Sequence, residues 1–158
     1  MRSKNTPHRI IVPDAKYGST LIAKMINGCM QAGRKATSTV LVYDALALIK
    51  EKTKANEMTY LEEALENVKP QMEVRSRRVG GASYQVPTPV RTDRKQTMAL
   101  RWIIAAARER SNSQYHSFPE KLAAEIMDAH ENAGNAIKKK LETHRMADAN
   151  KAFSHLRW

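Results

Sequence analysis

The residues best suited to binding chemistry are arginines that recur at a helical spacing. Arg94, Arg101 and Arg108 are seven positions apart, so they share one helix face, and Arg91 reaches the same face from the helix entry. The positions four residues after the first two arginines hold Met and Ala, so no acidic side chain neutralises them along the helix. A guanidinium binds phosphate in a two-point fashion, whereas a surface tuned only for solubility intersperses both charge signs. This face therefore predicts phosphate binding.

A second basic group lies in the segment VRSRRVGGASYQVPTPV, residues 74–90. Arg75, Arg77 and Arg78 precede the pair Gly80-Gly81, which allows a backbone to approach a ligand closely. Tyr84 is a candidate for stacking on bases, whereas Trp102 of the following helix is better explained by core packing. Because this ribbon and the arginine helix are adjacent in sequence, they predict one continuous nucleic-acid surface.

Three further basic stretches are weaker candidates. The N-terminal arm carries Arg9, a turn carries Arg34 and Lys35, and a later helix carries the run Lys138-Lys139-Lys140. A run of like charge is as consistent with a solvated helix face as with binding, so this last stretch leaves both interpretations open.

Catalytic and metal-binding patterns fail on their spacing. The segment GCMQAGRK resembles a phosphate-binding loop, but it lacks Lys directly after the second glycine and follows a predicted helix. His130-Glu131 begins like a zinc-protease motif, but the second histidine would stand at position 134, which is Gly. The five histidines show no metal-ligand pairing with the single cysteine. We therefore expect no enzyme, no metal and no cofactor.

Composition points to the same class of partner. The 158 residues include 27 Lys and Arg against 16 Asp and Glu, and the net charge is +11. With 42% hydrophobic residues the chain is expected to fold as one domain, residues 1–158, that binds a polyanion. The longest apolar run, Trp102–Ala107, is too short to span a membrane, and the first twenty residues lack the apolar core of a signal peptide. The single Cys29 fits a reducing compartment, where it is expected to be a small buried apolar residue.

Apolar spacing predicts six helices that position these residues. The predicted core positions are Leu21, Ile22, Met25, Ile26 and Cys29 in the first helix, and Leu41, Ala45, Leu48 and Ile49 in the second, over about 37–53. In the fourth helix, over about 93–109, they are Leu100, Ile103, Ile104 and Ala107; in the sixth they are Ile137, Leu141 and Met146. The arm, residues 1–19, shows no sustained period.

Capping and turn residues predict where the elements begin and end. Gly33 is expected to end the first helix, and Thr59 with Glu62 forms a capping box that would open the third, which Pro70 ends. The apolar period then changes from about 3.6 to 2, which predicts a β-hairpin over residues 72–88. Ser117, Pro119 and Glu120 predict the start of the fifth helix after a polar loop, and Gly134 separates it from the sixth. The predicted fold is mainly α, with one hairpin between helices three and four.

Several stretches closely resemble the bacterial-type small-subunit ribosomal protein seven family. They are ALENVKPQMEVRSRRVGGASYQVPTPV, MALRWIIAAARER and THRMADANKAFSHLRW, with AGRKATS and the entry VPDAKYGS in addition. The resemblance extends from about residue 11 to 158 and implies a six-helix bundle with a protruding hairpin. It also implies binding to the 3′ major domain of small-subunit rRNA, nucleation of the subunit head, and a place near the messenger and the exit-site tRNA. Small-subunit proteins nine, eleven and thirteen would be neighbours.

Matching positions assign rRNA contacts residue by residue. The resemblance implies such contacts for Arg34, Lys35, Arg75, Arg77, Arg78, Gly80, Gly81, Arg94, Lys95, Arg101 and Arg108, and the tail HRMADANKAFSHLRW adds Arg145 as a candidate. The arm MRSKNTPHR is less basic than in many members, and the loop SNSQYHSFPE is longer. The expected location is a cytoplasmic small ribosomal subunit, with an organellar ribosome as the alternative. An RNA-processing enzyme, a DNA-architectural protein and a repressor of its own messenger remain competing hypotheses.

Overall fold

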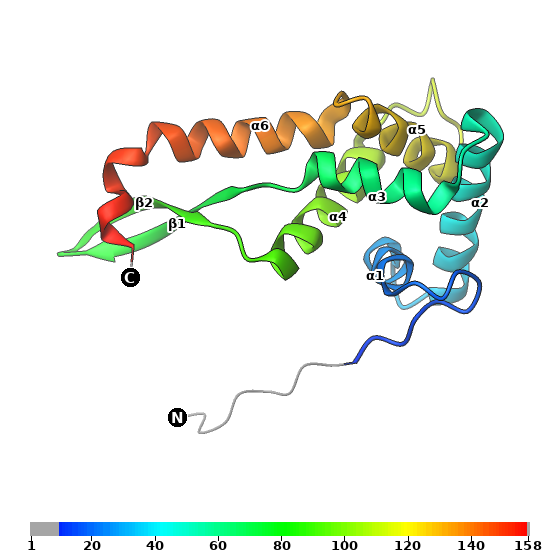
Figure 1. Cartoon of the computed structure of the whole chain (residues 1–158), viewed down its shortest axis with the longest axis horizontal. Helices are drawn as coiled ribbons and strands as arrows, with labels where there is room; N and C mark the ends of the chain where they lie inside the picture. The colour runs from blue at the N-terminus through cyan, green and yellow to red at the C-terminus, as the bar shows by residue number, and fades with distance from the viewer. Residues whose placement is uncertain (1–9, 158) are drawn as a thin grey trace.

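A group of packed helices carries a long two-stranded hairpin that extends from one side (Figure 1). The computed structural model describes residues 10–157. Over that range the elements are α1 (Thr20–Cys29), α2 (Lys35–Thr53), α3 (Glu57–Val68), β1 (Met72–Val79), β2 (Ala82–Pro89), α4 (Thr92–Glu109), α5 (Phe118–His130), α6 (Gly134–Ala149) and the 3₁₀ helix η1 (Lys151–Leu156). The prediction of a mainly helical fold with one hairpin between the third and fourth helices is confirmed.

The core lies where the first five helices meet. Helix α5 packs against α2, α3, α4 and α6, so it is buried on nearly every side. Leu122 and Ile126 of α5 are fully buried, as are Ile22 of α1, Leu46 of α2 and Ile103 of α4. Burial of such side chains contributes about 1.5–3 kcal/mol each, which fixes the orientation of every helix around α5.

The predicted core positions are buried in α1 and α4, whereas those of α2 and α6 are only partly correct. In α2 the fully buried side chains include Val42 and Leu46, whereas Leu41 and Leu48 lie at the half-buried edges of the stripe. In α6 Ile137 is buried, but Leu141 and Met146 are 59% and 43% exposed. After its first turns, helix α6 leaves the other helices and runs along the narrow hairpin (Figure 1). The hairpin is too small to cover Leu141 and Met146.

Several helix ends of the structure differ from the predicted ones. Helix α3 begins at Glu57 because the Asn56 side chain accepts a hydrogen bond from the Met58 amide at 3.0 Å, so the predicted capping box at Thr59 is wrong. Helix α1 ends at Cys29 rather than at Gly33, and α2 begins at Lys35 rather than at residue 37.

The start of α5 lies where it was predicted, although its capping bond differs, whereas Gly134 has a different place from the one predicted. Pro119 lies in the first turn of α5 as predicted, but the Ser117 side chain makes no capping bond there; instead the Glu120 carboxylate accepts from the His116 amide at 3.0 Å. Gly134 is the first residue of α6 rather than a separator, and its φ of +86° is one that glycine adopts readily.

The hairpin is antiparallel, and its register runs from the pair Met72↔Pro89 to the pair Val79↔Ala82. Gly80 and Gly81 form the two-residue turn with φ of +57° and +91°, as a type I′ turn requires. Two strands alone are marginal in water, and α6 and η1 supply the missing support. His144 Nε2 accepts from the Gln71 amide at 3.0 Å, and the Phe153 ring lies 5.3 Å from the Tyr84 ring. The hairpin is therefore supported by α6 and η1.

Candidate nucleic-acid interface

Helix α4 separates an apolar face from a basic face. The residues buried on its apolar face are Ala99, Leu100, Ile103, Ile104, Ala106 and Ala107. Arg94, Arg101 and Arg108 are exposed, as predicted from their spacing. Because the buried side chains hold the helix against α1, α3, α5 and α6, the three guanidinium groups project from a fixed backbone. We call these three residues the arginine row.

The arginine row is joined to the hairpin by one buried carboxylate. Glu73 of β1 is only 4% exposed, and its two oxygens accept from Arg75 Nε at 2.6 Å and from Arg94 Nε at 2.7 Å. The sequence finds no acidic partner for Arg94 along α4; the tertiary structure supplies one from 21 residues away. Burial alone would raise the pKa of Glu73, but the hydrogen bonds and charges of Arg94 and Arg75 outweigh it and lower that pKa. The ionised carboxylate therefore clamps β1 to the start of α4.

At the other end of the row, Arg108 closes helix α1. Its Nη2 donates to the Cys29 carbonyl oxygen at 3.1 Å, at the end of α1 where unpaired carbonyls attract a cation. Burial raises the pKa of the Cys29 thiol to about 11 despite the nearby arginine charge. Cys29 is thus an uncharged, buried side chain at neutral pH, as predicted.

The hairpin presents its arginines along the first strand. Arg75 and Arg78 are exposed, and Arg77 is half-buried opposite Tyr84. Tyr84 contacts the Phe153 ring of η1, so one part of its ring is already packed within the chain. Trp102 is half-buried against the core, in agreement with the packing prediction.

Four further candidate RNA-binding residues lie at or near the starts of α2 and α4. Arg34 is the N-cap residue of α2 and Lys35 is its first residue, and both side chains are exposed. Arg91 is the exposed N-cap residue of α4. Lys95 donates to Gln71 Oε1 at 2.7 Å, which is a second link between α4 and the base of the hairpin.

The basic residues of α6 belong to a separate edge. Helix α6 runs along the hairpin on the side away from α1 (Figure 1). Lys138, Lys139 and Arg145 are exposed there, and Lys139 pairs with Glu142 at 2.7 Å. The structure therefore does not bring these candidates together with the entry to α2. Arg9 lies outside the described residues.

Two basic residues matter in ways that the sequence reading missed. Lys24 stands on α1 beside the arginine row and donates a hydrogen bond to Gln96 Oε1 of α4 at 2.9 Å. Its position outside the apolar stripe of α1 is the sequence feature that could have indicated a surface role. Arg110 follows Arg108 by two residues but binds Glu125 and Asp128 of α5, and it is a structural group rather than a surface one.

The described part of the chain shows neither a metal-binding cluster nor a membrane-spanning helix. Within residues 10–157 no group of three or more His, Cys, Asp and Glu side chains is arranged to hold a metal ion. None of the helices in that range is long and apolar enough to cross a membrane.

Sequence comparison decides the family. The model of the family described as ribosomal protein S7p/S5e matches residues 1–151. The chain belongs to the ribosomal protein S7p/S5e family. A relative from Stenotrophomonas maltophilia (strain K279a), named small ribosomal subunit protein uS7, is 53% identical over 158 residues that cover 99% of both chains. Relatives of the same name from Xylella fastidiosa (strain M12) and Bradyrhizobium diazoefficiens are 52% and 50% identical over 157 residues and 99% of both chains.

Membership of the S7p/S5e family confirms two expectations. This is a structural protein of the ribosome and not an enzyme, in agreement with the failed catalytic motifs. The family fold implied by the resemblance, helices with one protruding hairpin, is the fold described above.

Proposed function

We propose that this chain is a structural component of the small ribosomal subunit that binds the 3′ major domain of the rRNA and nucleates assembly of the subunit head. The names of the relatives support the subunit. The observation that carries the rRNA contact is the arginine row, which a buried stripe holds in place and which Glu73 connects to the hairpin.

The proposed mechanism is electrostatic and geometric. Arg101 and Arg108 are held about 10 Å apart along the axis of α4, since each residue adds about 1.5 Å. Guanidinium groups at a fixed spacing neutralise phosphates and release counterions when the RNA brings its strands to matching positions. Such a surface reads shape and phosphate position, as in the recognition of structured RNA. Binding would therefore favour the folded form of the rRNA domain, which is the basis of nucleation.

The hairpin tip is the part proposed to meet the messenger and the exit-site tRNA. The Gly80-Gly81 turn lies at one end of the molecule, and the packed helices α1, α2, α3, α4 and α5 lie toward the other end (Figure 1). A narrow tip without side chains at its turn can approach a nucleic-acid strand closely. The neighbouring proteins nine, eleven and thirteen are part of the same proposal, and they rest on the family resemblance.

A salt titration tests the proposal. We expect the chain to bind a folded 3′ major-domain rRNA fragment tightly, with an affinity that falls steeply as salt rises and that resists duplex DNA competitor. The variant Arg78→Ala/Arg101→Ala should reduce the salt slope by about 1.5, because each phosphate contact contributes roughly 0.7–0.9. Both side chains are exposed, and no ion pair holds either of them within residues 10–157.

Lys52→Ala is the matched control. This lysine stands in the last turn of α2, about 25 Å along the helix from Lys35, and should leave the slope unchanged. Equal affinity for duplex DNA and for the rRNA fragment would reduce the surface to a general polyanion site and would refute specific rRNA binding. A slope that is the same in the double variant and in the parent would remove Arg78 and Arg101 from the interface.

A further inference from the structure

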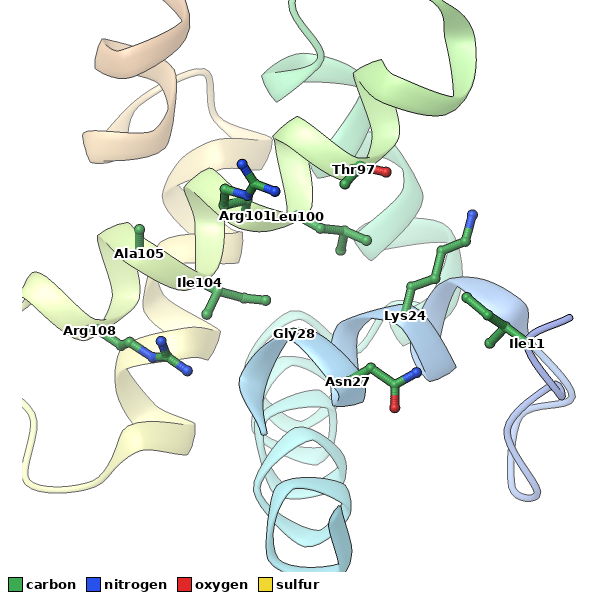
Figure 2. Close-up of a pocket in the computed structure, with 10 residues that line it drawn as sticks. All are labelled: Ile11, Lys24, Asn27, Gly28, Thr97, Leu100, Arg101, Ile104, Ala105 and Arg108. Carbon is green, nitrogen blue, oxygen red and sulfur yellow. The ribbon is translucent and has the colours of Figure 1, made fainter. Parts of the chain in front are cut away.

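A pocket opens between α1 and α4, beside the arginine row (Figure 2). Its volume of about 440 Å³ is in the range of small-ligand sites, roughly 300–1,000 Å³. Leu100 and Ile104 extend from α4 toward α1 and, with Ala105, form an apolar lining (Figure 2). The lining can accept a flat, largely apolar group.

The rim of the pocket has one sign of charge. Lys24 on α1 and Arg101 and Arg108 on α4 line it, and among residues 10–157 no acidic residue does. A depression on α2 shows the opposite pattern, since Asp44 and Glu51 line it and no basic residue of the described part of the chain does. Charge complementarity therefore directs an anion to the α1–α4 pocket.

Gly28 lets the Ile104 side chain of α4 pack directly against the backbone of α1, which forms one wall of the pocket. A Cβ at this position would lie 2.8 Å from Ile104 Cδ1, closer than packed atoms approach. A glycine inside a helix costs about 1 kcal/mol relative to alanine, and Gly28 is explained here by the close approach of Ile104 to α1. Asn27, the neighbouring residue, adds a carboxamide with both a donor and an acceptor at the same pocket.

We propose that this pocket holds one unpaired nucleobase of the bound RNA, with the adjoining phosphate against Arg101 and Lys24. The flat base packs against the apolar lining, and a guanidinium or the Asn27 amide forms hydrogen bonds with its edge. The phosphate backbone of the RNA supplies the negative charge. A paired base cannot enter, because its face is stacked and its edge is occupied within the duplex, whereas unpaired bases are splayed out to be read. This inference rests on the proposed rRNA contact and adds a position that selects for an unpaired nucleotide.

Filling the pocket tests the inference without changing charge. Ala105 is exposed on α4, so Ala105→Phe should fold normally while its ring occupies the pocket. We expect about a tenfold loss of affinity for the 3′ major-domain fragment, as for removal of one stacked base, with an unchanged salt slope. Thr97→Phe, from the same side of the pocket two turns earlier, should act in the same direction. Ala47→Phe, in the acidic depression on α2, is the matched control and should bind as the parent does.

Dimethyl sulfate probing supplies the direct readout. One or a few unpaired bases that react in the free RNA should be protected by the parent protein and by Ala47→Phe, and should react again in the complex with Ala105→Phe. If both phenylalanine variants of α4 bind and protect like the parent, the pocket holds no base and the inference is overturned. If the parent itself does not bind the fragment, the proposed function fails instead, so the two failures are distinguishable.

Discussion

Arg110 lies two residues after Arg108 but turns into the protein, so its replacement by alanine separates folding from RNA binding. Its Nε donates to Glu125 Oε2 at 2.8 Å, and its Nη2 also pairs with Asp128. Burial disfavours the charged form, but the hydrogen bonds to Asp128 and Glu125 outweigh it and raise the pKa of Arg110. Arg110 is therefore a permanent cation that neutralises Glu125 inside the protein.

The magnitude follows from what alanine leaves behind. Glu125 is 0% exposed, and without Arg110 its carboxylate keeps the Ala136 amide, at 2.9 Å, as its hydrogen-bond donor. Removing one partner of a buried ion pair costs about 3–5 kcal/mol, a large part of the roughly 5–15 kcal/mol that stabilises a domain. For a chain of this length the melting temperature should fall by roughly 6–20 °C.

Thermal and urea unfolding of Arg110→Ala measures this loss, and Arg101→Ala is the control. Arg101 is exposed on α4, the helix that Arg110 directly follows, so its substitution should change the unfolding free energy by less than about 0.5 kcal/mol while it weakens RNA binding. Below the melting temperature, Arg110→Ala should keep the parent's salt slope. Adding Glu125→Gln to the variant should recover part of the lost stability, because the uncompensated charge is gone. An Arg110→Ala protein as stable as the Arg101→Ala control would refute the assignment of a buried, charge-compensating role.

Two further substitutions test the support of the hairpin and of α6. Burial and the charge of Lys140 lower the pKa of His144, and its neutral ring accepts a hydrogen bond from the Gln71 amide. The stability that this hydrogen bond contributes is present above about pH 6.5 and is lost as the pH falls. Between pH 7.5 and 5.5 the parent should therefore lose more unfolding free energy than His144→Gln, and parallel curves would contradict this. Gly134→Ala should destabilise the chain by about 1–3 kcal/mol in urea unfolding. The reason is that φ of Gly134 is +86° and the new Cβ would lie 3.0 Å from Glu125 Oε1. An unchanged unfolding midpoint would show that α6 shifts without cost.

Local features of the interface could be predicted from sequence because they depend on neighbours along the chain. The two faces of α4 follow from the helical period, and the turn of the hairpin follows from the need of Gly80 and Gly81 for positive φ. Helix ends were predicted less well, because the Met58 amide donates a hydrogen bond to the Asn56 side chain and this cap sets the start of α3. It was also wrong for Leu141 and Met146, since a helical period does not indicate how far the packing partner extends.

By itself, the sequence determined the chemistry of this protein: an excess of basic residues, arginines at a seven-residue spacing, a glycine-tipped ribbon and motifs specific enough to indicate the family. Only the tertiary structure decided which cation does what. Arg94 is tied to a strand through Glu73, Arg108 closes α1, and Arg110 is buried against Glu125. The physical reason is that the role of a charge depends on its solvent exposure and on the carboxylates that the fold brings within hydrogen-bond distance, and those partners come from distant parts of the chain.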